Sequence, residues 1–304
     1  MTVINSLFPV FALIVLGNRL RHHGLTDPAF LKTADRLVYF IFFPVMLFWK
    51  IGGAATSGID WGLPAAALLA VVAMFLTSLL YIRVFRVGDY QSGTFSQSCY
   101  RFNTYIGMAI VITALGESGV TQFGILIGFV IPFINVLAVS TLIWFSGKRV
   151  SLGDRVRVTG RSIVTNPLIL ACLAGIIYAR LVNTFPVFID NTFRLTSMVT
   201  LPLALLSIGG ALTFDSLKGH LRLSLAASAV KLILFPVVGY LFFRLFDVTG
   251  VAFRVGMIFF ALPTATSIYV LSSQLNSDTE LASASIVVST VLSFFSLSAA
   301  LILT

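Results

Sequence analysis

The stretch YRFNTYIG, residues 100–107, places polar side chains and an arginine in the middle of an otherwise apolar segment. A second stretch, ALPTATS, residues 261–267, interrupts another apolar segment at its middle. A shift of 161 positions brings Asn103 onto Thr264, next to Pro263. The two interruptions therefore occupy corresponding places, which indicates that the chain contains one structural unit twice.

The match extends well beyond these two stretches. A shift of 158 positions pairs Pro9 with Pro167, Gly17 with Gly175, Phe30 with Phe188, Arg36-Leu37 with Arg194-Leu195, Pro44 with Pro202 and Gly52 with Gly210. The shift of 161 pairs Arg83 with Arg244, Phe85 with Phe246 and Glu117 with Asp278. A duplicated membrane unit with an odd number of spans inserts its copies in opposite orientations. This arrangement is typical of many secondary transporters.

Composition predicts a membrane protein, since 58% of the residues are hydrophobic and 10% are charged. A spanning helix needs about 20 mostly apolar residues. Ten segments qualify: residues 1–18, 37–59, 62–82, 90–116, 118–147, 162–179, 195–214, 223–243, 255–277 and 281–304. We expect an all-α integral membrane protein with ten transmembrane helices in two inverted five-helix repeats. The expected parts are residues 1–146, a connecting loop at 147–161, and residues 162–304.

Charge sets the expected orientation. The loops after odd-numbered spans carry thirteen Lys and Arg residues, and those after even-numbered spans carry five. Cytoplasmic loops hold the excess of cations, so the connecting loop should be cytoplasmic and both termini should lie outside. The net charge of +9 then reflects membrane orientation and not a nucleic-acid partner. Cys99 and Cys172 fall within spans, so we expect no disulfide.

The paired interruptions are the candidate site. A proline inside a helix removes a backbone hydrogen bond, and broken backbone at membrane depth is tolerated only inside protein or beside a wet cavity. The half-helix N-termini created there carry partial positive charge. Arg101 and Lys231 also lie within spans, whereas all eleven carboxylates sit in loops or at span ends. An anionic substrate would supply the missing counter-ion.

Other interpretations stay open at this stage. Isolated Ser, Thr and Pro residues in membrane helices often serve packing alone. Lys231 either faces the site or snorkels or binds a helix C-terminus, and Asn135 either lines the cavity or bonds a neighbouring helix. Proton coupling is disfavoured because the carboxylates and histidines lie outside the spans, although Glu117 and Asp278 end the interrupted ones. The spans hold no catalytic His, Asp or metal-ligand set, so the sequence predicts neither an enzyme nor a metal site.

Several motifs together resemble the auxin efflux carrier family, whose bacterial members include malonate-transporter-like proteins. They are Phe8-Pro9-Val10-Phe11 followed by Gly17, Arg36-Leu37 with Pro44, Arg101-Phe102-Asn103-Thr104 and Ala261-Leu262-Pro263. The resemblance covers essentially the whole chain. It implies a fold shared with sodium/bile-acid symporters, in which broken helices 4 and 9 cross and a carboxylate binds beside Asn103 and Pro263.

The resemblance further implies a scaffold of spans 1, 2, 6 and 7, often dimeric, and a transport part of spans 3–5 and 8–10 that moves like an elevator. One feature departs from the family. Its members commonly carry Gly-x-Pro after the asparagine of span 4, but this chain has Gly107-Met108-Ala109. A softer or shifted kink is expected there. The short connecting loop also makes regulation through that loop unexpected.

Our leading hypothesis is a secondary transporter of a small organic anion, a mono- or dicarboxylate, in the bacterial inner membrane. The expected substrate-binding residues are Arg101, Asn103, Thr104, Pro263, Thr264, Thr266 and Ser267, supported by Asn135, Lys231, Tyr105 and Tyr269. The alternatives are a sodium-coupled carrier of a larger amphipathic acid, with Phe102, Tyr105 and Tyr269 lining the pocket, and a channel or ligand sensor. We expect no cofactor, with sodium as the candidate coupling ion, and a homodimer through the scaffold helices.

Overall fold

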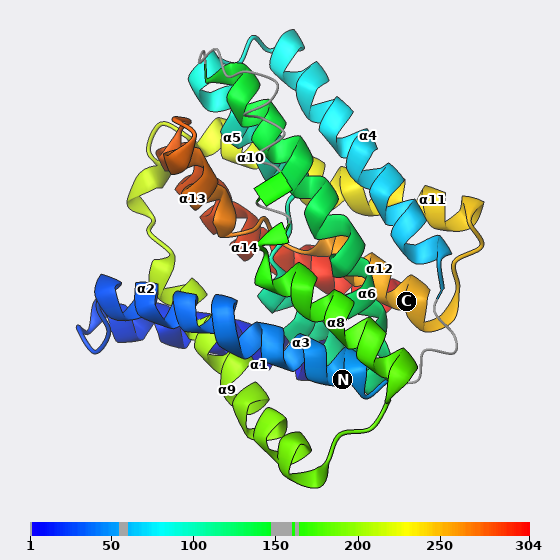
Figure 1. Cartoon of the computed structure of the whole chain (residues 1–304). Helices are drawn as coiled ribbons and strands as arrows, with labels where there is room; N and C mark the ends of the chain where they lie inside the picture. The colour runs from blue at the N-terminus through cyan, green and yellow to red at the C-terminus, as the bar shows by residue number, and fades with distance from the viewer. Residues whose placement is uncertain (1, 55–59, 147–159, 162–163) are drawn as a thin grey trace. The chain divides into compact units, whose positions relative to one another are not determined.

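The computed structural model describes residues 2–54, 60–146, 160–161 and 164–304, and every regular element in these ranges is helical (Figure 1). The predicted connecting loop, residues 147–161, lies outside the described residues except for positions 160 and 161. The elements are α1 (Thr2–His22), α2 (Pro28–Leu37), η1 (Val38–Phe42), α3 (Phe43–Gly52), α4 (Gly62–Val84), α5 (Asp89–Tyr100), α6 (Thr104–Phe145), α8 (Pro167–Leu181), α9 (Val187–Ala211), η2 (Asp215–Leu217), α10 (Leu221–Ala229), η3 (Val230–Leu234), α11 (Phe235–Leu245), α12 (Gly250–Ala261), α13 (Ser267–Gln274) and α14 (Thr279–Leu303).

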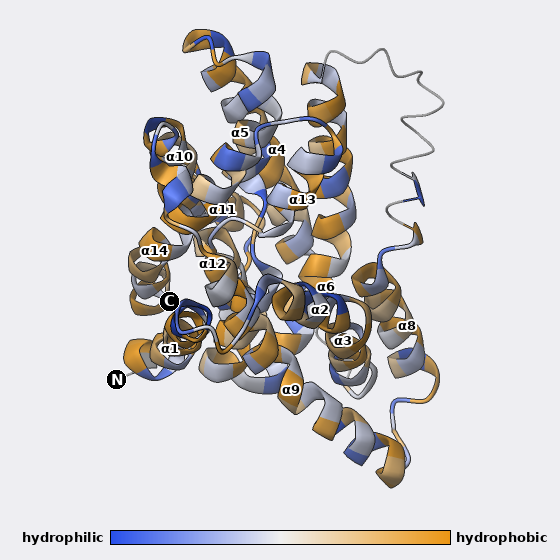
Figure 2. Ribbon diagram, turned by 90° about the vertical axis from the view of Figure 1, so that its left-hand side faces the viewer, coloured by the Kyte–Doolittle hydropathy of each residue, from blue (hydrophilic) through white to orange (hydrophobic). Residues whose placement is uncertain are grey.

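The helices are those of an integral membrane protein. Among the described residues, six helical segments are long and apolar enough to cross a bilayer: Val3–His22, Gly62–Val84, Asp89–Phe145, Val187–Ala211, Leu221–Leu245 and Thr279–Leu303. Two shorter apolar helices, α8 and α12, accompany them. Hydrophobic residues run along the helices, while hydrophilic ones are frequent in the connecting loops (Figure 2).

The chain forms two compact units. Unit 1 comprises Met1–Trp61, Tyr105–Phe129 and Val164–Leu212. Unit 2 comprises Gly62–Thr104, Val130–Ile163 and Thr213–Thr304. Each unit therefore combines segments from both halves of the sequence.

Close backbone contacts hold unit 1 together, with α1 on α9 and α8 on α3. A Cβ atom added to Gly17 would lie 2.1 Å from the carbonyl oxygen of Leu206, and one added to Gly209 would lie 1.9 Å from that of Ile14. On α8, a Cβ atom added to Gly175 would lie 3.0 Å from the Cβ atom of Ile51 on α3. Glycine lets membrane helices approach this closely, so that dispersion contacts between backbones replace a hydrophobic driving force.

Two prolines widen the helices that contain them. Pro44 and Pro236 each follow a π-helical turn, η1 and η3 respectively. A proline ring clashes with the carbonyl four residues earlier, and a wider turn relieves that contact. The second of these turns is where Lys231 lies. The chain thus continues through both prolines without ending the helix.

A glycine interrupts the long helical run of α6. Gly116 has φ 65° and ψ −155° inside an otherwise helical run. This backbone conformation is essentially restricted to glycine, because a Cβ atom would clash there. The sequence predicts a boundary between spans at the same position.

We predict that Gly209→Ala destabilises unit 1 by about 1–3 kcal/mol, the usual cost of overpacking. The new methyl group has no space against the α1 backbone. Thermal unfolding of the purified protein measures the effect. Gly53→Ala is the matched control, because its Cβ would make only ordinary contacts, the nearest at 3.4 Å. Equal stability of the two variants would show that α1 and α9 are not held at this distance.

Candidate functional site

Both interruptions are present in the structure as breaks between helices, and both lie in unit 2. The first is three residues long, since α5 ends at Tyr100 and α6 begins at Thr104. The second is five residues long, since α12 ends at Ala261 and α13 begins at Ser267. The break that lacks a proline is thus the shorter one.

The two breaks pair with each other. The backbone N–H of Asn103 donates to the carbonyl oxygen of Pro263 at 2.9 Å. The hydroxyl of Thr264 donates to the carbonyl of Ser98, in the last turn of α5, at 2.7 Å. The last carbonyls of a helix have no partner within it, and leaving them unpaired in hydrocarbon costs several kcal/mol each. Each break therefore supplies partners that the other requires.

Side chains from other helices form hydrogen bonds with backbone groups at the end of α12 and in the second break. Lys231, which is fully buried, donates from Nζ to the carbonyl of Phe260 at 3.1 Å. Ser296 donates to the carbonyl of Ala261 at 2.8 Å, and the N–H of Thr264 donates to Ser289 Oγ at 3.1 Å. Of the two interpretations of Lys231, the contact at a helix C-terminus is the one that this geometry matches. A cation there is also favoured by the helix dipole.

Arg101 is the first residue of the first break. Its guanidinium donates to Asn135 Oδ1 at 3.1 Å and to Ser267 Oγ at 2.9 Å, and the residue is 8% exposed. Both of these acceptors are neutral. Because Ser267 is the first residue of α13, the charge of Arg101 lies at the N-terminal end of that half-helix.

The structure thus brings Arg101, Asn135 and Ser267 together, and Asn103, Pro263 and Thr264 together, within unit 2. Thr104 and Thr266 are partly buried at the starts of α6 and α13. Tyr269 is 47% exposed, and the ring of Tyr105 in unit 1 contacts Phe43 at 4.9 Å between centroids. Lys231 faces the C-terminal end of α12 instead.

Serines on α14 are the residues that the sequence analysis missed. Ser289 and Ser296 hold the second break, and Ser285, Ser289 and Ser293 are all buried. Their spacing of four residues places them on one face of the helix. That periodicity was present in the sequence, although serine is common in membrane helices for packing reasons alone.

The arrangement is suited to holding a small anion. A buried guanidinium lies beside the N-terminus of α13, and α6 begins directly after Asn103. Helix N-termini present free N–H groups and partial positive charge, which together bind anions. In the part of the chain that the structure describes, no group of three His, Cys, Asp or Glu residues could hold a metal ion.

Comparison with known proteins places the chain among membrane transporters and not among enzymes. Residues 148–301, half of the chain, match the family model described as "Membrane transport protein". The protein belongs to this family, the auxin efflux carrier family that its motifs resemble.

Two full-length relatives are similar to the chain. An uncharacterized transporter of Methanocaldococcus jannaschii is 23% identical over 291 residues, covering 93% of each protein. A Rhizobium meliloti protein named "Putative malonate transporter" is 25% identical over 298 residues, covering 94% of this chain and 90% of the relative.

We predict that Thr264→Val destabilises the protein by about 1–3 kcal/mol, because it leaves a buried carbonyl of α5 without its hydroxyl donor. Thermal unfolding measures the loss. Thr77→Val is the control, since that hydroxyl bonds only the carbonyl of Ala73 one turn earlier in its own helix. An unchanged midpoint for Thr264→Val would mean that the two breaks do not support each other.

Proposed function

We propose that this protein is a secondary transporter of a small organic anion, a mono- or dicarboxylate. The observation that carries the proposal is the buried guanidinium of Arg101 at the N-terminal end of α13. A cation within a membrane span is costly and usually marks a substrate or ion pathway. The carboxylate of the substrate would replace one or both neutral acceptors, Asn135 and Ser267.

The charge of the site favours an anion over a neutral or cationic substrate. Each half-helix N-terminus contributes about half a positive charge, in addition to the full charge of Arg101. Asn103, Thr104, Thr266 and Ser267 are the hydrogen-bonding side chains nearest in sequence to these N-termini. The "Putative malonate transporter" that the chain resembles supports a carboxylate as the class of substrate.

The aromatic contacts favour a small substrate over a larger amphipathic acid. Phe102 is 5% exposed and packs against Phe259, with ring centroids 4.6 Å apart. Tyr105 has its own aromatic partner in Phe43. These rings are engaged in packing and would have to move to line a larger pocket.

The transporter would have ten spans in two inverted repeats. Packing within unit 1 supports this topology, because α1 on α9 pairs span 1 with span 7, and α8 on α3 pairs span 6 with span 2. Each pairing joins one repeat to the other, and exchanging the two repeats converts one pairing into the other. Spans 1, 2, 6 and 7 would form a scaffold and a homodimer contact, and the remaining spans would carry the site across by an elevator-like movement. Both termini would face the periplasm from the inner membrane.

We predict that purified protein in liposomes takes up malonate or another small carboxylate, and that Arg101→Gln lowers this uptake at least about tenfold. Loss of hydrogen bonds to a charged group costs about 1.5–3 kcal/mol, which corresponds to that change. Uptake of radiolabelled malonate, pyruvate and succinate, each with and without sodium, is the measurement. The sodium arm decides whether sodium is the coupling ion.

Lys231→Gln is the matched control for Arg101→Gln. It removes the other buried cation of unit 2 but keeps a donor for the carbonyl of Phe260, so uptake should largely persist. Saturable counterflow would distinguish a carrier from a channel. Failure of every carboxylate to be transported, or normal uptake by Arg101→Gln, would overturn the proposal.

A further inference from the structure

A small apolar cavity lies within unit 1, between the end of α1 and the start of α2. Its volume is about 110 Å³, and Leu20, Phe30, Leu31 and Leu206 are among the side chains that line it. Both α1 and α2 pack on α9 (Figure 1), whereas the backbones of α1 and α2 approach each other at few points. The cavity occupies the space that this packing leaves.

The cavity lies near the ends of two helices that are long and apolar enough to cross a bilayer, α1 and α9. Its lining residues on these helices belong to their last three turns, and each turn rises about 5.4 Å. Lipid headgroups meet acyl chains near the ends of spanning helices. Phe30 lines the cavity and is 50% exposed, so the cavity lies at the surface. Apolar cavities stay dry and take up apolar molecules, and the apolar molecules around a membrane span are acyl chains.

Two polar side chains, Thr26 and Ser207, also line the cavity. Ser207 donates to the carbonyl of Leu31 at 3.2 Å. Oγ1 of Thr26 is buried, and it has no hydrogen-bond partner among the described residues. Thr26 lies in the turn between α1 and α2, so its hydroxyl is on the headgroup side of the cavity.

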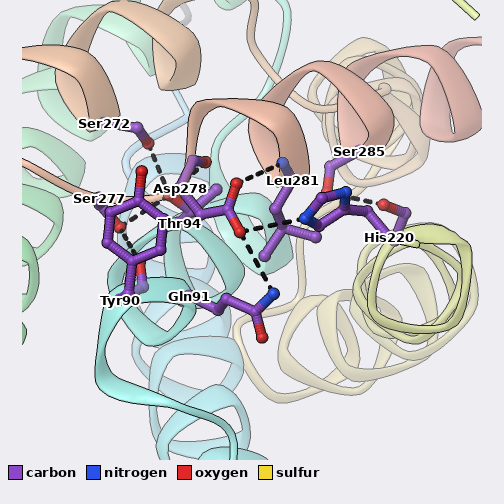
Figure 3. A network of polar contacts seen from close by, with 10 residues as sticks. Tyr90, Gln91, Thr94, His220, Ser272, Ser277, Asp278, Leu281 and Ser285 are labelled. Atoms are coloured by element: carbon purple, nitrogen blue, oxygen red, sulfur yellow. Dashed lines mark hydrogen bonds and ion pairs between the residues drawn. The ribbon is translucent and has the colours of Figure 1, made fainter. Parts of the chain in front are cut away.

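Buried polar groups normally have hydrogen-bond partners. The cluster around Asp278 in unit 2 is an example (Figure 3): its carboxylate accepts from Gln91 Nε2 at 3.2 Å and from the N–H of Leu281 at 2.9 Å, and lies 3.2 Å from Nε2 of His220. A buried group without partners, such as the hydroxyl of Thr26, costs free energy unless a ligand supplies one. An ester or phosphate oxygen of a lipid would accept from this hydroxyl.

The segment that contains the turn is basic. Residues 19–36 hold four Lys and Arg side chains and two carboxylates: Arg19, Arg21, Lys32, Arg36, Asp27 and Asp35. Arg21 donates to the carbonyl of Gly210, and Asp27 accepts from the N–H of Phe30 as the cap of α2. Arg19, Lys32 and Arg36 are exposed. Clusters of basic groups beside a membrane span attract anionic lipids.

Helix α2 separates apolar from basic side chains. Leu31 and Ala34 line the cavity and are buried. Lys32 and Arg36, one turn apart, are exposed on another side of the helix. A helix with an apolar and a basic face is typical of the membrane interface. The helix thus presents hydrocarbon to the cavity and positive charge outside it.

We propose that this cavity binds an acyl chain of an anionic phospholipid, whose headgroup lies at the turn between α1 and α2. The hydroxyl of Thr26 donates to an ester or phosphate oxygen of the lipid, and the exposed cations of residues 19–36 attract its charge. A neutral lipid would gain less from these cations, and a free anion would gain nothing from the cavity. The bound lipid holds the ends of α1, α2 and α9 together. The proposal concerns unit 1 and does not rest on the proposed function.

Thermal unfolding of the purified full-length protein in detergent, with lipid added, tests the site. Phosphatidylglycerol should raise the midpoint by at least about 3 °C, the size of shift that a ligand well above its Kd produces. Phosphatidylcholine with the same chains should give less than roughly half of this shift, because it carries no net charge. Inorganic phosphate should give none. Equal shifts with the two lipids, or the full shift with phosphate, would overturn the proposal.

Variants of the cavity show whether the lipid uses it. Leu203→Trp places a large ring in the cavity and should abolish the shift with phosphatidylglycerol. Leu195→Trp, on the same helix at a position 64% exposed, is the matched control and should keep it. Thr26→Val keeps the shape of the side chain, so it should be at least as stable as the wild type without lipid and should lose part of the shift. A full shift in Leu203→Trp, or a lipid-free Thr26→Val less stable than the wild type, would contradict the proposal.

The charges are tested by the double variant Lys32→Gln/Arg36→Gln, which should reduce the shift with phosphatidylglycerol to that with phosphatidylcholine. Arg83→Gln/Arg222→Gln removes two exposed cations of unit 2 and should leave the shift unchanged. An equal loss in both double variants would mean that the lipid is attracted by the surface in general, against the proposal.

Native mass spectrometry identifies the occupant directly. The wild type should retain one phosphatidylglycerol per chain, and Leu203→Trp should lose it. If the wild type instead retains no lipid and forms a dimer that Leu203→Trp separates, a second copy of the chain occupies the cavity and the proposal is wrong.

Discussion

The requirement that buried backbone groups find hydrogen-bond partners in hydrocarbon governs this structure. Two interrupted helices would each leave several carbonyl and N–H groups unpaired at membrane depth. The bond from Asn103 to Pro263 and the bond from Thr264 to Ser98 satisfy part of this requirement reciprocally. Lys231, Ser289 and Ser296 satisfy much of the rest. The paired breaks can persist because other helices are held close enough to supply these groups.

Different interactions stabilise the two units. Unit 1 relies on glycines that allow α1 and α9 to approach until backbone contacts backbone. Unit 2 relies on buried polar side chains, including serines on α14 and the cluster around Asp278. Polar networks need every partner in place. A bound charge changes a network of hydrogen bonds far more than it changes a contact between glycines.

The two buried cations of unit 2 illustrate how position decides role. Lys231 lies at a helix C-terminus, where the carbonyls favour positive charge. Arg101 directly follows the last residue of α5 and donates to Ser267, the first residue of α13, so it lies between the C-terminal end of one half-helix and the N-terminal end of another. This difference in contacts supports the proposal that Arg101, and not Lys231, binds the substrate.

The sequence alone determined the membrane class, the positions of the interruptions and the boundary at Gly116, because composition and helix-breaking residues act locally. The resemblance to a transporter family, which the family match confirms, was also carried by motifs along the chain. Only the tertiary structure decided that Lys231 bonds the end of α12 and that Arg101 bonds the start of α13. It alone brought Asp278 to His220, and Thr264 to a helix end distant in sequence. Such contacts depend on how helices pack, and a residue's spacing along its own helix does not specify which residue of another helix it meets.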